Sequence, residues 1–339
     1  MPVILVTEPE YRKAQTFFEQ FAAQEPEWTI LPSVPDEETF LQRILETRAW
    51  LAVIGMVCYS EAVYEALSRN APADGTAVLT RFGVGMDNVD RDLAKKWNVR
   101  LANTPGVLDH SVAEHTLWLL GAAAKRLGTA HEAVRRGEFP SLPGRELFGK
   151  RLLIAGFGGI GRAAARIAHW GFGMEVRAFG RRSLTELLEA ENAVSEAENA
   201  VSESEFLVRH GLAGYSNEID EMLPNADAVC VLLASNSETR GFFNAERFEK
   251  MRRNVLFVNT SRGALVDEDA LFDFLTKNPE AAASLDVFQT EPYVPQTSGK
   301  DLRTLPNVFL TPHLGSCTLE ANLAIARSAL AQTIQGMGK

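Results

Sequence analysis

The stretch Arg151-Leu-Leu-Ile-Ala-Gly-Phe-Gly-Gly-Ile-Gly161 decides the fold of this 339-residue chain. Its first five residues form an apolar run that predicts a buried parallel strand. The glycines that follow have the spacing G-x-G-x-x-G, and residues 162–170 continue as an alanine-rich helical pattern. A glycine triplet between a strand and a helix is the setting in which this motif binds a dinucleotide. We therefore predict a dinucleotide site here, in preference to a purely structural tight turn.

Each glycine of this loop has a separate expected task. Gly156 allows the tight turn, Gly158 lets the backbone approach a diphosphate, and Gly161 lets the helix pack on the strand. Free N–H groups at the helix N-terminus would bind the diphosphate, because the helix dipole favours an anion there. The predicted cofactor-binding residues of the loop are Gly156, Gly158, Gly159, Ile160 and Gly161.

The end of the next predicted strand, residues 175–179, indicates which dinucleotide is bound. In NAD-binding units an acidic residue about 20 positions after the glycines accepts a hydrogen bond from the ribose 2′-hydroxyl. This chain has Gly180 at that place, followed by Arg181, Arg182 and Ser183. Loss of the carboxylate removes repulsion against a 2′-phosphate, and a guanidinium can bind that phosphate through two hydrogen bonds. The residues favour NADP over NAD, and the alternative is a solvated basic loop.

Composition narrows the function classes. The net charge of −10 and the pI near 5.3 argue against a general nucleic-acid binder. The length suggests two domains, each with its own hydrophobic core. No apolar run is long enough to cross a bilayer, and the N-terminus does not resemble a signal peptide. Cys58, Cys230 and Cys317 are far apart and form no disulfide framework or metal-binding pair, so we expect a cytoplasmic protein without a bound metal.

Strands and helices alternate along the first hundred residues, which predicts a small parallel α/β domain. A polar, proline-containing stretch after residue 23 is interpreted as a connection. Asp87 and Asn88 are expected to cap a helix over residues 89–97. Residues 111–136 predict one long helix, on which His115 and His131 are expected to be surface or packing residues. Residues 320–336 predict a closing helix that packs back on the first domain.

Three predicted strands of the dinucleotide-binding sheet are followed by Arg262, Glu291 and His313. Reduction of a ketone needs a hydride donor, a cation that orients the carbonyl and a proton donor. Histidine suits the proton transfer, and a neighbouring carboxylate stabilises its imidazolium form. Arginine can hold a substrate carboxylate and polarise the adjacent carbonyl. Taken singly, each residue could be an ordinary surface, cap or loop residue, so the prediction depends on the three occurring together.

Five stretches of the chain resemble the D-isomer-specific 2-hydroxyacid dehydrogenase family, and the likeness covers nearly the whole length. They are Gly83-Val-Gly-Met-Asp-Asn-Val-Asp90, the Gly156–Gly161 loop, Asn259-Thr-Ser-Arg-Gly263, Asp286-Val-Phe-Gln-Thr-Glu-Pro292 and Pro312-His-Leu-Gly-Ser316. The expected fold is α/β, with a Rossmann-type doubly wound parallel sheet and a smaller flavodoxin-like α/β substrate domain. We expect residues 1–103 and 307–339 to form the substrate domain and residues 104–306 to form the dinucleotide-binding domain.

The resemblance also implies roles for individual residues. Arg262 would bind the substrate carboxylate and carbonyl, His313 would be the general acid and base, and Glu291 would tune it. Asp286 would contact the nicotinamide amide. Thr260, Ser261, Gly315 and Ser316 would lie along the cofactor, and the backbone around Val84 and Gly85 would hold the substrate carboxylate. The resemblance further implies a homodimer formed through the nucleotide domain and its long helix.

The substrate is less well defined by the sequence. Arg81 matches an arginine of the phosphoglycerate dehydrogenase pattern, but no second basic residue for a phosphate occurs near Gly55 and Met56. A small unphosphorylated 2-oxo acid, such as glyoxylate or hydroxypyruvate, is therefore preferred over phosphoglycerate. An alternative of another class is a non-catalytic dinucleotide sensor that binds other proteins, because the family includes such members.

One feature has no counterpart in that resemblance. The heptad Ala190-Glu-Asn-Ala-Val-Ser-Glu196 is followed at once by an identical copy, Ala197–Glu203. Two heptads are too few to predict a coiled coil. We interpret the region near 184–213 as a peripheral insertion, with contact to a partner protein as the less favoured alternative.

Overall fold

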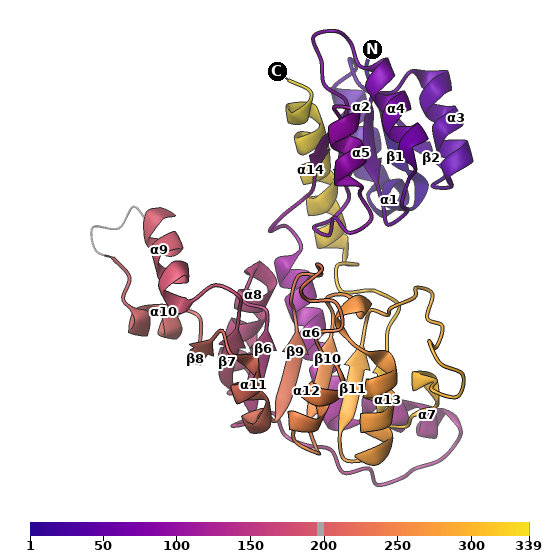
Figure 1. Cartoon of the computed structure of the whole chain (residues 1–339). Coiled ribbons are helices and arrows are strands. Elements are labelled where there is room, and N and C mark those ends of the chain that lie inside the picture. The colour runs from indigo at the N-terminus through magenta and orange to yellow at the C-terminus, as the bar shows by residue number, and fades with distance from the viewer. Residues whose placement is uncertain (195–199, 339) are drawn as a thin grey trace. The chain divides into compact units, whose positions relative to one another are not determined.

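The computed structural model describes residues 1–194 and 200–338, which form two compact α/β units. The N-terminal unit comprises residues 1–108 and the chain from Ser316 onward, and the central unit comprises Asp109–Gly315. Each unit has its own parallel sheet with helices on both faces (Figure 1). Two α/β domains were predicted from the sequence, and the structure confirms that class of fold.

The N-terminal unit contains a five-stranded parallel sheet in the order β2-β1-β3-β4-β5, the flavodoxin-like order. Its strands are β1 (Val3–Thr7), β2 (Thr29–Ser33), β3 (Leu51–Ile54), β4 (Val78–Arg81) and β5 (Arg100–Ala102). Its helices are α1 (Glu8–Lys13), α2 (Gln15–Gln24), α3 (Glu37–Thr47), α4 (Glu61–Asn70), α5 (Arg91–Lys96) and α14 (Leu319–Gly336). All four residues of β3 and of β4 are buried, because helices cover both faces of these central strands.

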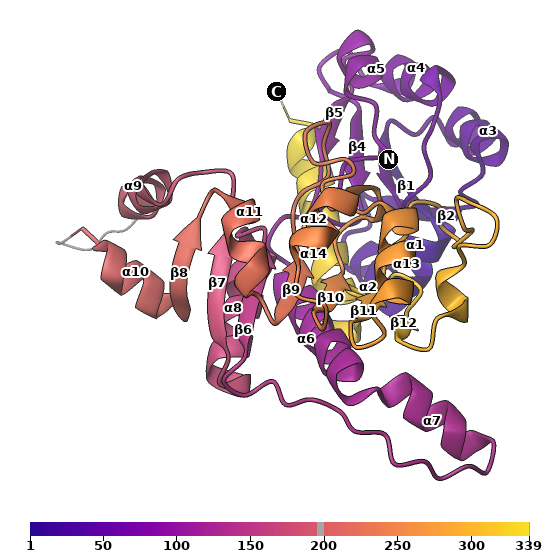
Figure 2. The same cartoon turned by 60° about the horizontal axis from the view of Figure 1, so that its bottom comes forward.

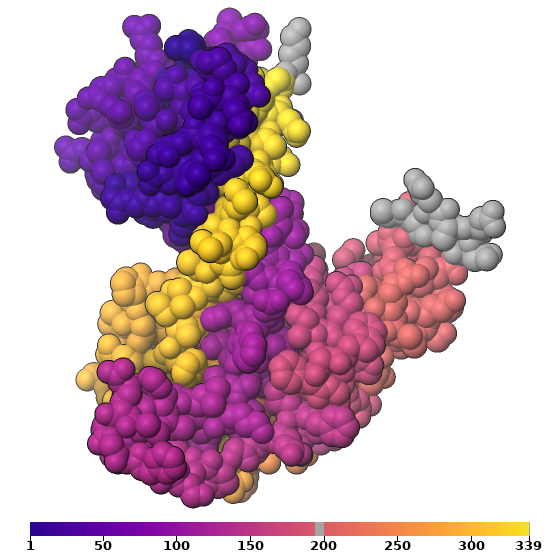
Figure 3. Space-filling model, turned by 180° about the vertical axis from the view of Figure 1, so that it is seen from behind, coloured from indigo at the N-terminus to yellow at the C-terminus, as the bar shows by residue number. Residues whose placement is uncertain are grey.

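The closing helix α14 packs on β3, β4 and β5, as predicted. The Thr333 hydroxyl on the helix lies 2.7 Å from that of Thr80 on β4, and both side chains are fully buried. The Arg100 guanidinium donates to the Gly336 carbonyl over 3.0 Å, which satisfies a carbonyl at the C-terminal end of the helix. The last helix of the chain is therefore part of the N-terminal fold (Figure 3).

Two local predictions for this unit were wrong. The connection after residue 23 contains the edge strand β2, whose Pro32 is tolerated because only one side of an edge strand needs backbone donors. The cap of α5 is Asp90, whose carboxylate accepts from the N–H groups of Asp92 and Leu93. Asn88 instead donates to the carbonyls of Gly55 and Val57, so it joins two loops at the end of the sheet.

The central unit contains a seven-stranded parallel sheet in the order β12-β11-β10-β9-β6-β7-β8, a doubly wound arrangement. Its strands are β6 (Arg151–Ala155), β7 (Glu175–Phe179), β8 (Leu212–Ser216), β9 (Ala228–Val231), β10 (Leu256–Asn259), β11 (Ala282–Leu285) and β12 (Val308–Leu310). Its helices are α6 (Asp109–Lys125), α7 (Leu127–Arg135), α8 (Gly159–Arg166), α9 (Leu184–Val194), α10 (Glu203–Arg209), α11 (Ile219–Met222), α12 (Ala245–Lys250) and α13 (Glu268–Lys277).

Alternate side chains of the central strands pack into two separate hydrophobic cores, one on each face of the sheet. Leu152 and Ile154 of β6 face a core shared with α6 and α8, whereas Leu153 and Ala155 face a core shared with α12 and α13. Because successive side chains of a strand point to opposite faces, an all-apolar run is required when both faces are covered. The sequence pattern at residues 151–155 therefore has a direct structural cause.

The helix predicted over residues 111–136 is divided into α6 and α7. Arg126 lies between them in the left-handed backbone conformation, with φ of 53°. Such a residue ends one helix and redirects the next, at a small conformational cost for a non-glycine residue. Helix α7 and the segment that follows it extend away from the rest of the central unit (Figure 2).

The units divide after Leu108 and after Gly315, later in the chain than the expected boundaries at 103/104 and 306/307. Strand β12 pairs with β11, which keeps residues 308–310 and the turn after them in the central sheet. At the first boundary, the Thr104 amide donates to the Gly83 carbonyl over 3.0 Å, so that residue remains with the N-terminal unit.

Helix α9 contains the start of the first heptad copy, and α10 begins at Glu203, the last residue of the second copy. From the first copy, the Glu191 carboxylate accepts from Arg162 and from Arg209, each over 2.9 Å. The side-chain oxygen of Asn192 accepts from the Val201 amide over 2.7 Å, and Ser202 caps α10 in a capping box with Glu205. The part of the repeat at residues 195–199 lies outside the described residues. Strand β8, which follows α10, was not predicted.

A search of the described residues for a helix with the length and apolarity needed to span a bilayer found none.

Candidate functional site

The candidate site lies at the carboxyl edge of the central sheet. Strand order reverses between β6 and β9, because β7 and β8 continue to one side of β6 whereas β10, β11 and β12 continue to the other. Ligands of open α/β sheets bind in the crevice outside the strand ends at such a switch point. The glycine loop follows β6, and the three predicted catalytic residues follow β10, β11 and β12.

The glycine loop has the close approaches that its sequence predicted. Gly156 has φ of 115°, and an added Cβ would overlap the backbone of Leu232 and Leu233. A Cβ on Gly161 would overlap the Gly156 carbonyl, so the first turn of α8 lies directly against the loop. At Gly158, by contrast, no atom lies within 4 Å of the Cβ position. That open side is where a diphosphate can approach the backbone.

Asp109, at the start of α6, is a neighbour of this loop that the sequence did not suggest. A Cβ on Gly159 would overlap the Asp109 carboxylate, which therefore lies directly over the glycine. Burial raises the pKa of this carboxyl group. Asp109 belongs to α6, which is distant from the glycine loop in the sequence. The spacing of residues along the chain could therefore not predict this contact.

The residues after β7 are arranged by Tyr215 of β8. The Tyr215 hydroxyl donates to the Arg182 carbonyl over 2.7 Å, and a Cβ on Gly180 would overlap that hydroxyl. An acidic side chain at position 180 would thus require the tyrosine to move. Arg181 is exposed and lies 3.8 Å from Glu238, while Ser183 caps α9 through hydrogen bonds with Glu186. After β7 the structure thus has an exposed arginine in a long ion pair and a glycine, which carries no carboxylate, at position 180.

His313 and Glu291 form a close pair. The Nδ1 atom of His313 lies 2.8 Å from Oε2 of Glu291, while Oε1 of Glu291 accepts from the Phe288 amide over 3.1 Å. Burial works to raise the pKa of the Glu291 carboxyl, but the hydrogen bond and charge of His313, the Phe288 amide and the charge of Arg262 lower it overall. The carboxylate is therefore ionised near neutral pH.

The ionised partner determines which nitrogen of His313 is available. A carboxylate can only accept hydrogen bonds, so Nδ1 carries a proton and donates a hydrogen bond to Glu291. The Nε2 atom is left to exchange a proton with a ligand, as in other acid–base histidines oriented by a carboxylate. The pair thus has the geometry of a general acid and base with a fixed ring orientation.

Asp286 anchors the turn that carries His313. Its carboxylate is 1% exposed and accepts from the Thr311 hydroxyl at 2.5 Å and from the amides of Leu314 and Gly315 at 2.8 Å. The Asp286 carbonyl also accepts from the His313 amide over 2.8 Å. These bonds hold the turn on both sides of His313, which itself has φ of 55°.

His115, expected to be a packing or surface residue, is a further partner of Asp286. Its Nε2 atom lies 3.2 Å from the carboxylate and 3.4 Å from the Thr311 hydroxyl. Burial works to raise the pKa of Asp286, but His115, Thr311 and the Leu314 amide lower it overall. Helix α6 thus contributes to the support of the His313 turn, a contact that only the three-dimensional fold reveals.

The turn that carries Arg262 is fixed by buried polar groups. Asn259 accepts from the Ser261 amide and donates to the Arg262 carbonyl, and it is itself buried. The Ser261 hydroxyl donates to the Leu233 carbonyl, and the Thr260 and Thr116 hydroxyls lie 2.6 Å apart. These contacts tie the ends of β9 and β10 to α6, so the predicted cofactor wall is part of one rigid edge.

The Arg262 turn also touches the turn before Glu291. A Cβ on Gly263 would overlap the Phe288 carbonyl carbon and oxygen, so only a glycine allows these backbones to approach so closely. Because the Phe288 amide donates a hydrogen bond to Glu291, this contact links the turn of Arg262 to the turn of Glu291.

The remaining predicted residues belong to the N-terminal unit. Arg81 is buried, donates to the Phe82 carbonyl and the Met56 thioether, and lies over Gly83. Val84 accepts from Asn103 over 2.8 Å, which shapes the loop that continues to Gly85. Ser316 also falls in this unit. Arg81 is the last residue of β4, and Val84 and Gly85 lie on the loop that follows this strand.

The described residues contain no group of three or more histidine, cysteine, aspartate or glutamate side chains arranged to hold a metal ion. The glycine loop after β6 and the residues that follow β10, β11 and β12 define a class: a dinucleotide-dependent α/β oxidoreductase with a histidine–carboxylate pair and an arginine at the carboxyl edge of its doubly wound sheet.

Comparison with known proteins agrees with that class. Residues 117–214 and 211–315 match the model of the D-isomer specific 2-hydroxyacid dehydrogenase NAD-binding domain. Glyoxylate/hydroxypyruvate reductase B of Escherichia fergusonii is 34% identical over 288 residues, which cover 84% of this chain and 81% of the relative. The corresponding protein of Salmonella typhimurium is 34% identical over 297 residues, 85% of this chain and 84% of the relative.

Solved structures extend the likeness. A glyoxylate reductase from Paecilomyes thermophila aligns with a TM-score of 0.73 and 25% identity over 100% of this chain and 97% of its own. D-2-hydroxyisocaproate dehydrogenase aligns with a TM-score of 0.77 at 19% identity over 98% of this chain and 96% of its own, which shows a shared fold. The chain belongs to the D-isomer specific 2-hydroxyacid dehydrogenase family, as its motifs predicted, and is a nicotinamide-dependent oxidoreductase acting on the CH–OH group of hydroxy acids.

Proposed function

We propose that Arg262, Glu291 and His313 carry out the reduction of a small 2-oxo acid to the corresponding D-2-hydroxy acid. His313 Nε2 donates the proton to the carbonyl oxygen, Glu291 holds the ring through Nδ1, and Arg262 binds the substrate carboxylate and polarises the carbonyl. The nicotinamide, when bound, supplies the hydride. The observation that carries the proposal is the 2.8 Å hydrogen bond between Nδ1 of His313 and the Glu291 carboxylate.

Substitution of the histidine tests this assignment. We expect His313→Asn to lower kcat by about 10²- to 10⁴-fold, because general acid–base catalysis contributes on that scale, and to leave cofactor affinity unchanged. His131→Asn on α7 is the matched control, because it removes an exposed histidine of the same unit. Stopped-flow or steady-state oxidation of the reduced cofactor measures the rate. Full turnover by His313→Asn would exclude the proposed role of this residue.

We propose that the cofactor is NADP, with NAD as the alternative. Arg181 supports this preference because its guanidinium is exposed and its ion pair to the exposed Glu238 spans 3.8 Å. Such a pair is weak, so a 2′-phosphate can displace the glutamate. The overlap between Tyr215 and any side chain at Gly180 supports it further, since the carboxylate that favours NAD cannot be placed there without rearrangement.

Two opposite changes test the cofactor preference. Arg181→Ala should weaken NADPH binding about tenfold through loss of a charge-assisted hydrogen bond and should leave NADH binding unchanged. Glu238→Gln should strengthen NADPH binding, because it removes the competing carboxylate. Arg177→Ala on β7 serves as the control for loss of a nearby exposed cation. Fluorescence titration gives each dissociation constant, and an unweakened NADPH affinity in Arg181→Ala would refute the 2′-phosphate assignment.

We propose an unphosphorylated substrate of the glyoxylate or hydroxypyruvate type, in preference to phosphoglycerate. The relatives at 34% identity carry the name glyoxylate/hydroxypyruvate reductase, which supports this class. In the N-terminal unit Arg81 contacts the apolar Met56, and the nearby Lys13 ammonium is 3.4 Å from the buried Glu10 carboxylate. A doubly charged phosphate would have to compete with that carboxylate. Turnover of phosphohydroxypyruvate faster than that of hydroxypyruvate would reverse the preference.

We also propose a cytoplasmic homodimer formed through the central unit. The three cysteines of the chain are free, which supports a location in a reducing compartment. Large apolar side chains are exposed along α6, α7 and the segment that follows, including Trp118 at 71% and Phe139 at 95% exposure. Figure 3 shows this segment at the surface of the central unit. Exposed apolar surface of this kind is typical of a subunit interface.

A further inference from the structure

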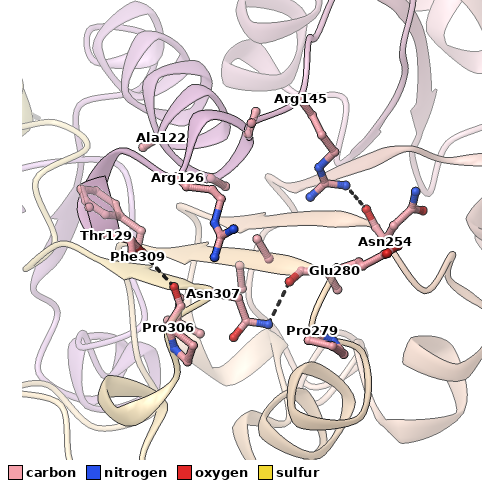
Figure 4. Close-up of a pocket in the computed structure, with 18 of the residues that line it drawn as sticks. Ala122, Arg126, Thr129, Arg145, Asn254, Pro279, Glu280, Pro306, Asn307 and Phe309 are labelled. Carbon is pink, nitrogen blue, oxygen red and sulfur yellow. Dashed lines mark hydrogen bonds between the residues drawn. The ribbon is translucent and has the colours of Figure 1, made fainter. Parts of the chain in front are cut away.

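A second hollow lies at the opposite, amino edge of the central sheet. It encloses about 390 Å³ between the C-terminal end of α6, the segment 143–145 and the first residues of β11 and β12 (Figure 4). That volume falls within the roughly 300–1,000 Å³ of sites for small molecules. Neither the glycine loop nor Arg262, Glu291 or His313 lines it.

The hollow exists because small residues meet there. Residues 122–124 lie near the C-terminal end of α6, Ala281 precedes β11 and Ala282 and Ala283 begin it, so no large side chain from these positions fills the space. Close packing is the rule in protein interiors, and a concavity of this size next to a sheet is therefore a specific feature of the sequence. Segment 143–145 closes one side, because the Arg145 amide donates to the Ala124 carbonyl over 2.7 Å.

Two guanidinium groups point toward the centre of this hollow, one from Arg126 and one from Arg145 (Figure 4). Among the described residues, neither has a carboxylate within ion-pair distance. Arg145 donates one hydrogen bond, to the Asn254 carbonyl, although its guanidinium has five N–H donors. Glu280 is the acidic residue of the lining, so the net charge of the lining is positive.

The surroundings of Arg145 are unfavourable for a bare cation. Burial lowers the pKa of Arg145, whereas the charges of Glu280 and Asp227 act to raise it without cancelling that effect. Arg145 is half-buried, and a charge partly removed from water gains from a partner that offsets its desolvation. An anion in the hollow would supply that partner and would use the open donors of both arginines.

The position of the hollow connects it to the reaction. Asn254 precedes β10, Ala282 begins β11 and Asn307 precedes β12. The carboxyl ends of the same three strands lead to Arg262, Glu291 and His313. The two edges are therefore the opposite ends of shared strands.

We infer that the amino edge of the central sheet is a second binding site, which takes a small anion bearing a carboxylate or a phosphate. Arg126 and Arg145 bind the charged group, and the alanine floor accommodates a short apolar body. The assignment does not depend on which 2-oxo acid is the substrate.

Isothermal titration with inorganic phosphate tests the site on the full-length protein saturated with NADP⁺, at ionic strength held constant with chloride. The wild type should bind phosphate saturably. Arg126→Asn should weaken that binding at least tenfold, and asparagine suits the left-handed backbone at this position. Lys125→Asn, which removes the adjacent exposed cation outside the lining, should change the affinity less than twofold. Ala282→Leu keeps both arginines but fills the hollow, and it should also abolish binding.

Three results would overturn the inference. The first is an absence of saturable phosphate binding by the wild type. The second is an unchanged affinity in Arg126→Asn, which would place the phosphate elsewhere in the protein. The third is a change in oligomeric state in Arg126→Asn without a change in phosphate binding, which would assign the hollow to a second copy of the chain. Sedimentation of each variant distinguishes the last result.

Discussion

Glu268 is a buried carboxyl group at the start of α13, close to the catalytic candidates. One oxygen accepts from the Gln289 amide over 2.6 Å, and the other is buried without a hydrogen-bond partner among the described groups. Burial raises its pKa to about 7, and the charges of Asp269, Asp267 and Glu291 act in the same direction. The group therefore titrates near neutral pH in the folded protein.

This shift predicts a pH-dependent stability. The folded state holds the Glu268 proton up to about pH 7, whereas the unfolded chain releases it near the ordinary value of 4.5. Folded protein thus binds more protons between these values, and stability falls as the pH rises through this window, by about 3 kcal/mol at most. Glu268→Gln should remove that loss and raise Tm at pH 8. Thermal denaturation at pH 5 and pH 8 measures the difference.

The exposed Glu249→Gln on the preceding helix is the control, because it removes the same formal charge without removing a buried carboxyl group. If Glu268→Gln and the wild type lost the same stability between pH 5 and pH 8, Glu268 would not be the source of the dependence. Asp286 and Glu291 affect the pH dependence of stability in the acid range instead. Their lowered pKa values contribute stability above the unfolded values near 4, and that contribution is lost as the pH falls.

At the scale of elements, the α9–α10 region shows how a repeat is accommodated. Glu191 binds Arg162 of α8 and Arg209 of α10, and the buried His210 adjoins the same carboxylate at 3.4 Å. Burial and the charge of Arg162 lower the pKa of His210, so it is neutral at pH 7. The contacts that hold the region are made by residues of the first heptad copy and by residues from Val201 onward.

Deletion of residues 197–203 should therefore leave a folded, active enzyme. The remaining heptad keeps Glu191 and Asn192, and its own valine and serine can take the places of Val201 and Ser202. The side-chain oxygen of Asn192 now accepts a hydrogen bond from the Val201 amide. In the deletion variant it would accept one from the amide two residues after Asn192, as asparagine commonly does in turns. We expect kcat/KM within about threefold of the wild type. A loss of folding, followed by circular dichroism, would contradict this account.

Glu191→Ala provides the contrast within the same region. It removes one side chain but leaves Arg162 and the buried His210 without their shared acceptor, so it should destabilise the protein by about 2–3 kcal/mol. A single substitution should thus be more harmful than a deletion of seven residues. Urea denaturation of the two variants side by side measures both effects.

The elements that the sequence predicted best are those with long, one-sided or fully apolar patterns. The strand at 151–155 was predicted with the observed bounds, and the closing helix at 320–336 was predicted to within one residue of its observed start. Strand β2 was missed because Pro32 and its polar neighbours match a loop pattern, and pairing with β1 outweighs that preference. The helix over 111–136 was predicted without its break, because a left-handed arginine at position 126 leaves no trace in hydrophobic periodicity.

The residues of the candidate site also divide into those that the sequence could predict and those that it could not. Arg262, Glu291 and His313 could be found because each follows a strand of one sheet, and parallel strands bring their carboxyl ends together. Asp109 and His115 could not, since both reach the site from α6 across the fold. Contacts between elements distant in sequence are beyond the reach of spacing arguments.

At the scale of the whole molecule, the exposed apolar segment of the central unit predicts the oligomeric state. The double variant Trp118→Glu/Phe139→Glu should be monomeric, because two charges would have to be buried at the interface. Val208→Glu on α10, where the valine is similarly exposed, should remain a dimer. Light scattering after gel filtration gives the mass. A monomeric wild type, or a dimeric double variant, would contradict the proposed interface.

The backbone contact at Gly263 has a consequence for how this enzyme can change over evolutionary time. Arg262 and Glu291 come from different strands, yet the turns that carry them touch with no side chain between them. The two turns are therefore expected to move together and not independently. A mutation that moves either turn is therefore expected to move both, so a substitution in one turn also affects the other. The close backbone contact at Gly263 thus restrains evolutionary change at both positions together.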